Sequence, residues 1–170
     1  ISMYWEQVRK NYLAFESDMR AGASEVYVHA MPGGQYTNLK EQARGVGLDD
    51  SRWMEVSQAY ADVNEMFGNI VKVTPSSKVV GDMAILMVSS GLTREQVEDP
   101  DYEVVFPESV VQMMHGDLGR PEGGWPEGIQ KKVLKGKKPL ATRPGANMAP
   151  LDLAAERKTL DEKLGRPATD

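Results

Sequence analysis

The stretch that decides the fold is KVTPSSKVVGDMAILMVSSG, residues 72–91. Its second half carries apolar side chains nearly all the way round a helix: Val79, Val80, Met83, Ile85, Leu86 and Met87. A helix without a polar face is a buried helix, so this segment predicts the centre of a helical core. Gly91 is expected to end the helix, because glycine adopts the left-handed conformation at a helix C-terminus without strain.

The first half of the stretch raises a question of chemistry. Pro75 fits the first helical position, where its missing N–H has no cost, which makes Thr74 the predicted N-cap. The same turn gathers the hydroxyls of Ser76 and Ser77 and the ammonium of Lys78 near the positive end of the helix. The spacing leaves two interpretations open: helix capping alone, which is the simpler, or a site for a carboxylate or a ureido-type carbonyl.

Gln35 presents a similar choice. It follows Pro32, Gly33 and Gly34, directly after the β-rich stretch SEVYVHAM, residues 24–31, for which we predict a single strand. Open and barrel α/β sheets bind ligands at the ends of their strands, so a ligand contact is one interpretation of Gln35. A turn residue that bonds its own loop is the other, and the pattern favours neither.

The rest of the chain is predicted to be helical. Apolar residues at helical spacing predict helices over 3–17, 37–45, 51–66, 107–114 and 127–135, with Gly22 ending the first and Thr93 capping a short run. Residues 137–150 read as a linker, and residues 151–165 as a last helix that should dock on something. A single strand cannot form a sheet, and the chain starts on Ile-Ser within a helical pattern. Both features favour a segment of a longer polypeptide.

Composition bounds the class of protein. The chain has 170 residues, of which 41% are hydrophobic and 26% charged, which is ordinary for one soluble globular domain or part of one. The net charge of −5 and the scattered cations argue against nucleic acid. Five lysines do cluster, and a solvated helix end is favoured over an anion-binding patch for them: Lys131, Lys132, Lys135, Lys137 and Lys138.

Several chemistries lack the residues that they need. The chain has no cysteine, which excludes disulfides, thiolate nucleophiles and cysteine-ligated zinc. His29 and His115 are far apart and no paired carboxylates accompany them, so we expect no metal site built from this chain alone. No apolar run approaches the roughly 18 residues that span a bilayer, no signal peptide is recognisable, and no Walker or Rossmann motif is present. We expect no membrane association and a cytoplasmic location.

Four motifs occur together and in order: HAMPGGQYTNLKEQAR (29–44), AYADVNEMFGNIVKVTPSSKVVGDMA (59–84), FPESVVQMMHGDLGRPEGGWPE (106–127) and KKVLKG (131–136). The combination closely resembles the pyruvate carboxylase family, in the later part of its carboxyltransferase domain, and the resemblance covers nearly the whole chain. The oxaloacetate decarboxylase α-subunit and the transcarboxylase carboxyltransferase subunit share a similar core. Lys78 in TPSSK and the segment GDLGRPEGGWPE look more like pyruvate carboxylase than those relatives.

The resemblance implies a mainly α fold: a helical funnel segment that follows the last strand of a TIM-type carboxyltransferase barrel, with SEVYVHAM as one short residual strand. Residues 1–36 would be the end of the barrel, 37–136 the funnel, and 137–170 a linker and a helix leading toward the next domain.

The resemblance also implies roles for four residues. Thr74 matches the family threonine that relays a proton between biotin and pyruvate or its enolate, a task suited to a hydroxyl because it donates and accepts in one place. Gln35, Ser77 and Lys78 match positions that line the biotin pocket. Their donors fit the ureido oxygen, on which negative charge grows as CO2 leaves.

The implied activity belongs to a whole enzyme: ATP-dependent carboxylation of pyruvate to oxaloacetate, by a homotetramer, with biotin on a carrier domain outside this chain. A divalent metal, Zn or Mn, would be bound by the barrel and ATP by a separate domain. This chain contains neither the family's metal ligands nor its biotin attachment motif, so alone it is expected to be inactive. Two alternatives remain: a subunit of a related biotin-dependent decarboxylase or transcarboxylase, and a non-catalytic helical assembly module in which Thr74 is only a cap.

Overall fold

The structure is a computed structural model that describes residues 1–16 and 24–167. The described residues form helices and connecting loops, with no strand among them. The α-helices are α1 (Ser2–Arg9), α2 (Val26–His29), α3 (Gly33–Gly45), α4 (Trp53–Met66), α5 (Ser76–Ser90), α6 (Arg94–Glu98), α7 (Glu108–His115), α8 (Glu127–Leu134) and α9 (Leu153–Leu164). Short 3-10 turns cover Lys10–Phe15, Asp50–Arg52 and Pro144–Asn147. The predicted mainly α fold is confirmed.

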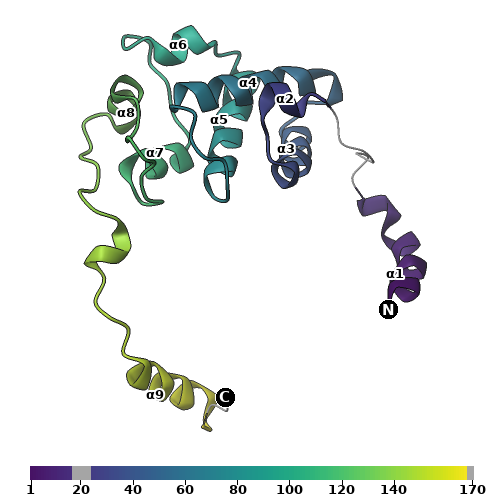
Figure 1. The fold of residues 1–170 in the computed structure, drawn as a ribbon, viewed down its shortest axis with the longest axis vertical. Coiled ribbons are helices and arrows are strands. Elements are labelled where there is room, and N and C mark those ends of the chain that lie inside the picture. Colours follow the sequence, from purple (N-terminus) through teal and green to yellow (C-terminus); the bar gives the residue numbers. More distant parts are fainter. Residues whose placement is uncertain (17–23, 168–170) are drawn as a thin grey trace.

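Helix α5 is the centre of the bundle. It packs against α3, α4 and α7, as Figure 1 shows, and α8 then packs on the far side of α7. Its apolar side chains are buried or partly buried, and Gly91 ends it in the left-handed conformation. The predicted burial of this helix and its predicted end at Gly91 are therefore both confirmed.

Helix α4 supplies the opposite wall of the core. The apolar stripe predicted from the sequence faces inward and is buried along its whole length: Trp53, Val56, Tyr60, Val63 and Met66. Phe67 continues the stripe, and Gly68 turns the chain with a positive φ of 89°.

The contact between α3 and α5 depends on Gly81. A Cβ at this position would lie 2.7 Å from both Gln35 Nε2 and Leu39 Cδ1. Leu39 is completely buried, so it cannot easily move aside. The absence of a side chain at Gly81 lets α3 approach closely and seats Gln35 against the central helix.

The short helix α6 is secured at both ends. Thr93 and Gln96 form the capping box at its N-terminus, which confirms the predicted Thr93 cap. At its C-terminus Lys132 Nζ donates to the carbonyl oxygens of Gln96, Val97 and Asp99, at 3.0, 2.8 and 2.5 Å. The predicted solvated helix end is thus wrong for Lys132, which joins α8 to α6, while the other four clustered lysines are exposed.

The predicted strand over 24–31 is wrong. Residues Val26–His29 form the single helical turn α2, whose N–H groups bond carbonyls three or four residues back, such as Ala30 N to Val26 O at 2.8 Å. A strand needs a neighbour to receive its backbone hydrogen bonds, and the described residues offer none. The segment therefore closes its hydrogen bonds locally.

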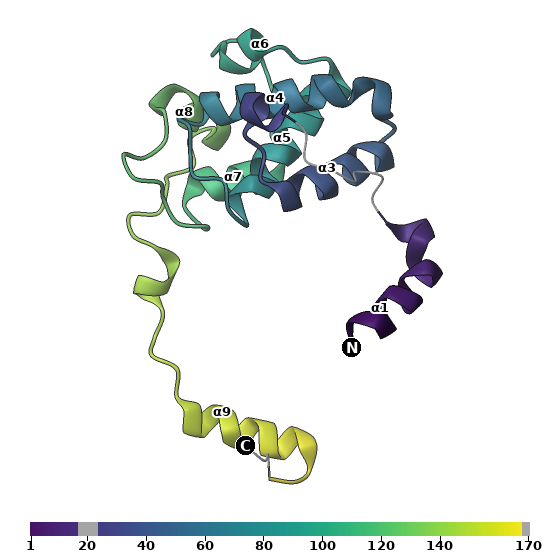
Figure 2. The same cartoon turned by 45° about the vertical axis from the view of Figure 1, so that its right-hand side comes forward.

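The terminal helices lie apart from the bundle in both views (Figures 1 and 2). The first predicted helix is confirmed as α1 and the 3-10 turn up to Phe15, whereas the predicted stop at Gly22 lies outside the described residues. Helix α9 forms as predicted but buries no side chain, so its predicted docking is not seen here. Within 1–16 and 24–167, no helix combines the length and apolarity needed to cross a membrane.

Candidate functional site at the start of the central helix

Helix α5 begins later than the sequence predicts. Pro75 occupies the N-cap position, Ser76 is the first helical residue, and the Thr74–Pro75 peptide bond is cis. Thr74 therefore is not the N-cap, and the cap position makes no side-chain hydrogen bond.

Backbone carbonyls explain why no cap is needed. Ser77 N donates to Val73 O at 3.2 Å, and Lys78 N and Val79 N donate to Pro75 O at 3.1 and 3.2 Å. The bond from Val79 is the first regular bond of the helix, whereas the amides of Ser77 and Lys78 would otherwise require a capping side chain or a bound anion. The predicted anion site therefore loses the amides of Ser77 and Lys78 as donors.

Ser76 closes the turn that leads into α5. Its Oγ lies 2.7 Å from both Val71 O and Val73 O, and it accepts from Val73 N at 3.1 Å. One hydroxyl thus contacts three backbone groups of the incoming loop and donates its single proton to one of the two carbonyls at a time. Ser76 is a structural residue here rather than a free ligand donor.

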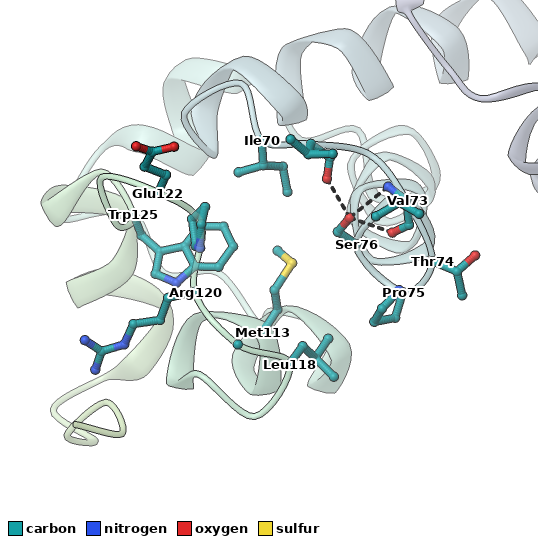
Figure 3. A pocket seen from close by; sticks show the side chains of 13 residues that line it. Ile70, Val73, Thr74, Pro75, Ser76, Met113, Leu118, Arg120, Glu122 and Trp125 are labelled. Carbon is teal, nitrogen blue, oxygen red and sulfur yellow. Dashed lines mark hydrogen bonds between the residues drawn. The ribbon is translucent and has the colours of Figure 1, made fainter. Parts of the chain in front are cut away.

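Thr74 is exposed, and its hydroxyl has no hydrogen-bond partner within the part of the chain that the structure describes. Figure 3 shows its side chain turned away from Met113 and Trp125, which lie across the adjoining pocket. The hydroxyl is therefore free to bond a group that approaches from outside the helical bundle.

Ser77 and Gln35 lie on one side of α5. Ser77 is only 4% exposed, and Tyr60 OH donates to its carbonyl oxygen at 3.4 Å. Gly81, four residues after Ser77, shares its helix face and contacts Gln35. Gln35 itself belongs to the first turn of α3, and its Nε2 is buried without a hydrogen-bond partner among the described residues. A buried amide donor without an acceptor marks a position where a ligand or another segment can bind.

Lys78 lies on the α7 side of α5. Its Nζ lies 2.9 and 2.7 Å from the two carboxylate oxygens of Asp82, and Ser109 Oγ of α7 donates to Asp82 Oδ2 at 2.7 Å. The structure thus brings Thr74, Ser77 and Lys78 to one turn and Gln35 beside the next.

A pocket of about 380 Å³ adjoins this turn (Figure 3). It is lined by the loop before α5, by Met113 of α7, and by Leu118, Arg120 and Trp125 of the Gly/Pro-rich connector. Because the Thr74 hydroxyl points away from it, this pocket lies behind the threonine rather than in front of its reactive oxygen.

Sequence reasoning missed Asp82 and Ser109. Asp82 had a local signal, because an acidic residue four positions after a lysine on a helix is placed for an ion pair. Ser109 is on another helix, so no local pattern connects it with Lys78.

As for a metal, the residues that the structure describes hold no group of three or more candidate ligands.

The model of the conserved carboxylase domain matches residues 26–170. The chain is 52% identical over 170 residues to pyruvate carboxylase of Bacillus subtilis and 47% identical over 170 residues to the human mitochondrial enzyme. These matches cover 100% and 99% of the chain but only 15% and 14% of those relatives, so the chain spans about one seventh of their length.

Solved structures give the same result. The complete multifunctional pyruvate carboxylase of Rhizobium etli is 63% identical, with a TM-score of 0.89 over 99% of this chain and 16% of its own. The carboxyl transferase domain of that enzyme, solved with pyruvate and biocytin, is 63% identical with a TM-score of 0.87, over 99% of this chain and 28% of its own. The chain therefore belongs to the conserved carboxylase domain family, and along its length it is similar to the carboxyl transferase region of pyruvate carboxylases.

Proposed function

We propose that the chain is a segment of a biotin-dependent pyruvate carboxylase and that it supplies Thr74 as a proton relay to the carboxyl transfer site. The observation that carries the proposal is the exposed hydroxyl of Thr74, without a partner in the described residues, at the start of the central helix. Similarity to pyruvate carboxylases over the whole chain supports the reaction class.

Thr74 suits the relay because its hydroxyl accepts one proton while it donates another. Biotin, when bound in its carboxylated form, supplies the CO2 and accepts a proton as that CO2 leaves. The hydroxyl of Thr74 gives up its proton on the biotin side and takes one from the methyl group of pyruvate. The resulting pyruvate enolate then forms its new C–C bond to CO2, which gives oxaloacetate.

Two side chains have donors that fit the ureido oxygen of biotin. Gln35 holds a buried amide nitrogen without an acceptor, and the ammonium of Lys78 keeps one hydrogen beyond the two directed at Asp82. Donors aimed at an oxygen that gains negative charge lower the barrier to the loss of CO2. We assign Ser77, which lies on the Gly81 face of α5, to the wall of the same site.

The remaining parts of the site belong, in this proposal, to segments outside this chain. They are the barrel with its divalent Zn or Mn, the biotin carrier domain and the ATP-dependent domain of a homotetramer. Within the chain, residues 1–36 would end the barrel, 37–136 form the funnel, and 137–170 lead to the next domain. We further propose a cytoplasmic location, with which a chain without cysteines is compatible.

The test is Thr74→Ala in the full-length enzyme that carries this segment. We expect pyruvate carboxylation to be lost while biotin-dependent ATP cleavage stays largely intact, and Thr74→Ser to keep part of the activity. Since Thr74 does not cap α5, the thermal midpoint should hardly change. Carboxylation at the wild-type rate would overturn the proposal and favour a helical assembly module.

Thr93→Ala is the matched control. Thr93 is a true cap of α6, so its loss should cost about 1 kcal/mol of stability without a specific effect on carboxylation. ATP cleavage distinguishes a pyruvate carboxylase from the remaining alternative. A related decarboxylase or transcarboxylase subunit would transfer the carboxyl group without cleaving ATP.

A further inference from the structure

The side chain of Asp82, on α5, forms a hydrogen bond that links α5 to α7. Its carboxylate accepts from Lys78 Nζ at both oxygens, at 2.9 and 2.7 Å, and from Ser109 Oγ of α7 at 2.7 Å. The side chain of Asp82 is 21% exposed, whereas that of Lys78 is 57% exposed. The acceptor is therefore mostly buried and the cation reaches it from the surface.

The third partner distinguishes this pair from an ordinary surface ion pair. A pair of residues four apart on one exposed helix face contributes little, because both side chains stay mobile. Gln58 and Asp62 of α4 form such a contact, at 2.9 Å and exposed. The carboxylate of Asp82, by contrast, also accepts a hydrogen bond from a hydroxyl on a different helix, which fixes its orientation independently of Lys78.

A fixed carboxylate restricts the lysine. Lysine has a flexible four-carbon stem and three rotatable donors, so an unrestrained ammonium samples many directions. Two of its three N–H groups can bond the two oxygens of Asp82, which leaves one N–H for a partner beyond the surface of α5. The position of that N–H follows from the position of Asp82, and so from α7.

We infer that Asp82, oriented by Ser109, is a positioning residue that holds the Lys78 ammonium with one N–H aimed at the carbonyl oxygen of the ligand. The inference rests on the proposed function, in which that carbonyl belongs to the ureido ring of biotin. It assigns to α7, through Ser109, a role in ligand binding.

The experiment uses the full-length enzyme in the reverse direction, with oxaloacetate as the carboxyl donor and free biotin as the probe. Asp82→Asn keeps the shape of the side chain and removes its charge. We expect it to raise the biotin concentration for half-maximal rate about tenfold, and Ser109→Ala to raise it roughly threefold, with less effect on the maximal rate. Ser109→Thr, which keeps the hydroxyl, should restore the wild-type value.

A double variant tests whether Asp82 acts through Lys78. Lys78→Met should itself raise the half-saturating biotin concentration, and adding Asp82→Asn should then have almost no further effect. Additive effects would overturn the inference, as would an unchanged value for Asp82→Asn or Lys78→Met. Asp62→Asn, which removes the charge of an exposed carboxylate on α4, is the control and should leave biotin saturation unchanged.

Two further measurements distinguish this inference from a purely structural role of Asp82 and from a failure of the proposed function. If Asp82→Asn and Ser109→Ala lower the thermal midpoint but leave biotin saturation unchanged, the link only joins α5 to α7 and the inference is wrong. If Thr74→Ala leaves carboxylation intact, the proposed relay is wrong, while the biotin saturation of the Lys78 and Asp82 variants still decides this inference.

Discussion

At the scale of single residues, His29 shows how burial sets a charge state. The side chain is 2% exposed, and its Nδ1 accepts from Met31 N at 2.9 Å, so the ring proton lies on Nε2. Nε2 is buried without a partner among the described residues. Burial lowers the pKa of His29; the charge of Glu25 opposes this, and that of Lys72 reinforces it. Burial in the folded chain therefore favours the neutral form of His29 over the charged form.

The lowered pKa of His29 predicts a pH dependence of stability. Below about pH 6.5 the unfolded chain binds a proton at this residue more readily than the folded chain does. The free energy of unfolding should therefore fall as the pH drops below that value, until the folded pKa is reached. His29→Gln should flatten the curve in urea unfolding between pH 5 and 7.5. Equal slopes for the variant and the wild type would contradict the argument.

At the scale of elements, the approach of α3 to α5 makes Gly81 sensitive to substitution. In Gly81→Ala the new methyl would lie 2.7 Å from Leu39 Cδ1 and from Gln35 Nε2. Overpacking costs about 1–3 kcal/mol, and the better helix propensity of alanine returns up to about 1 kcal/mol. We expect a net loss of about 1 kcal/mol in chemical denaturation, together with displacement of Gln35.

Gly128 offers a control for that prediction. It lies inside α8, and a Cβ there meets no atom within 4 Å. Gly128→Ala should be neutral or stabilise the chain by up to about 1 kcal/mol. If both alanines behaved alike, close packing at Gly81 would not be the reason for its glycine.

At the scale of the whole molecule, α1 and the 3-10 turn after it expose several large apolar side chains close together in the sequence. Six large side chains are more than half exposed: Met3, Tyr4, Trp5, Tyr12, Leu13 and Phe15. The chain covers 28% of the solved carboxyl transferase domain to which it is similar. We expect the remainder of such a domain to cover this face.

Trp5 tests that expectation. Trp5→Ser removes a side chain that is 60% exposed in this chain, so it should leave the thermal midpoint of the isolated chain unchanged. In the full-length enzyme, where we expect the ring to be covered, the same change should lower the midpoint, since an aromatic side chain deleted from a packed site costs about 3–5 kcal/mol. Equal effects in the two proteins would show that the face stays open.

The sequence by itself determined the elements whose signals are local. The stripe on α4, the wholly apolar α5, the Thr93 cap and the glycine at the end of α5 all follow from contacts within about four residues. The spacing and the resemblance to a known family predicted Thr74, Gln35, Ser77 and Lys78 as site residues, and the structure places these residues on neighbouring turns.

Only the tertiary structure decided what depends on distant partners. Residues 24–31 have the composition of a strand, but Val26–His29 form a helical turn, and no neighbouring strand is present among the described residues. Thr74 fits the N-cap pattern, but Pro75 takes the cap position, and backbone carbonyls bond the amides of Ser77 and Lys78 instead. Ser109 reaches Asp82, and Lys132 reaches the carbonyls of α6, across long stretches of chain. Periodicity records only which face of an element is buried, and it does not record which element covers that face.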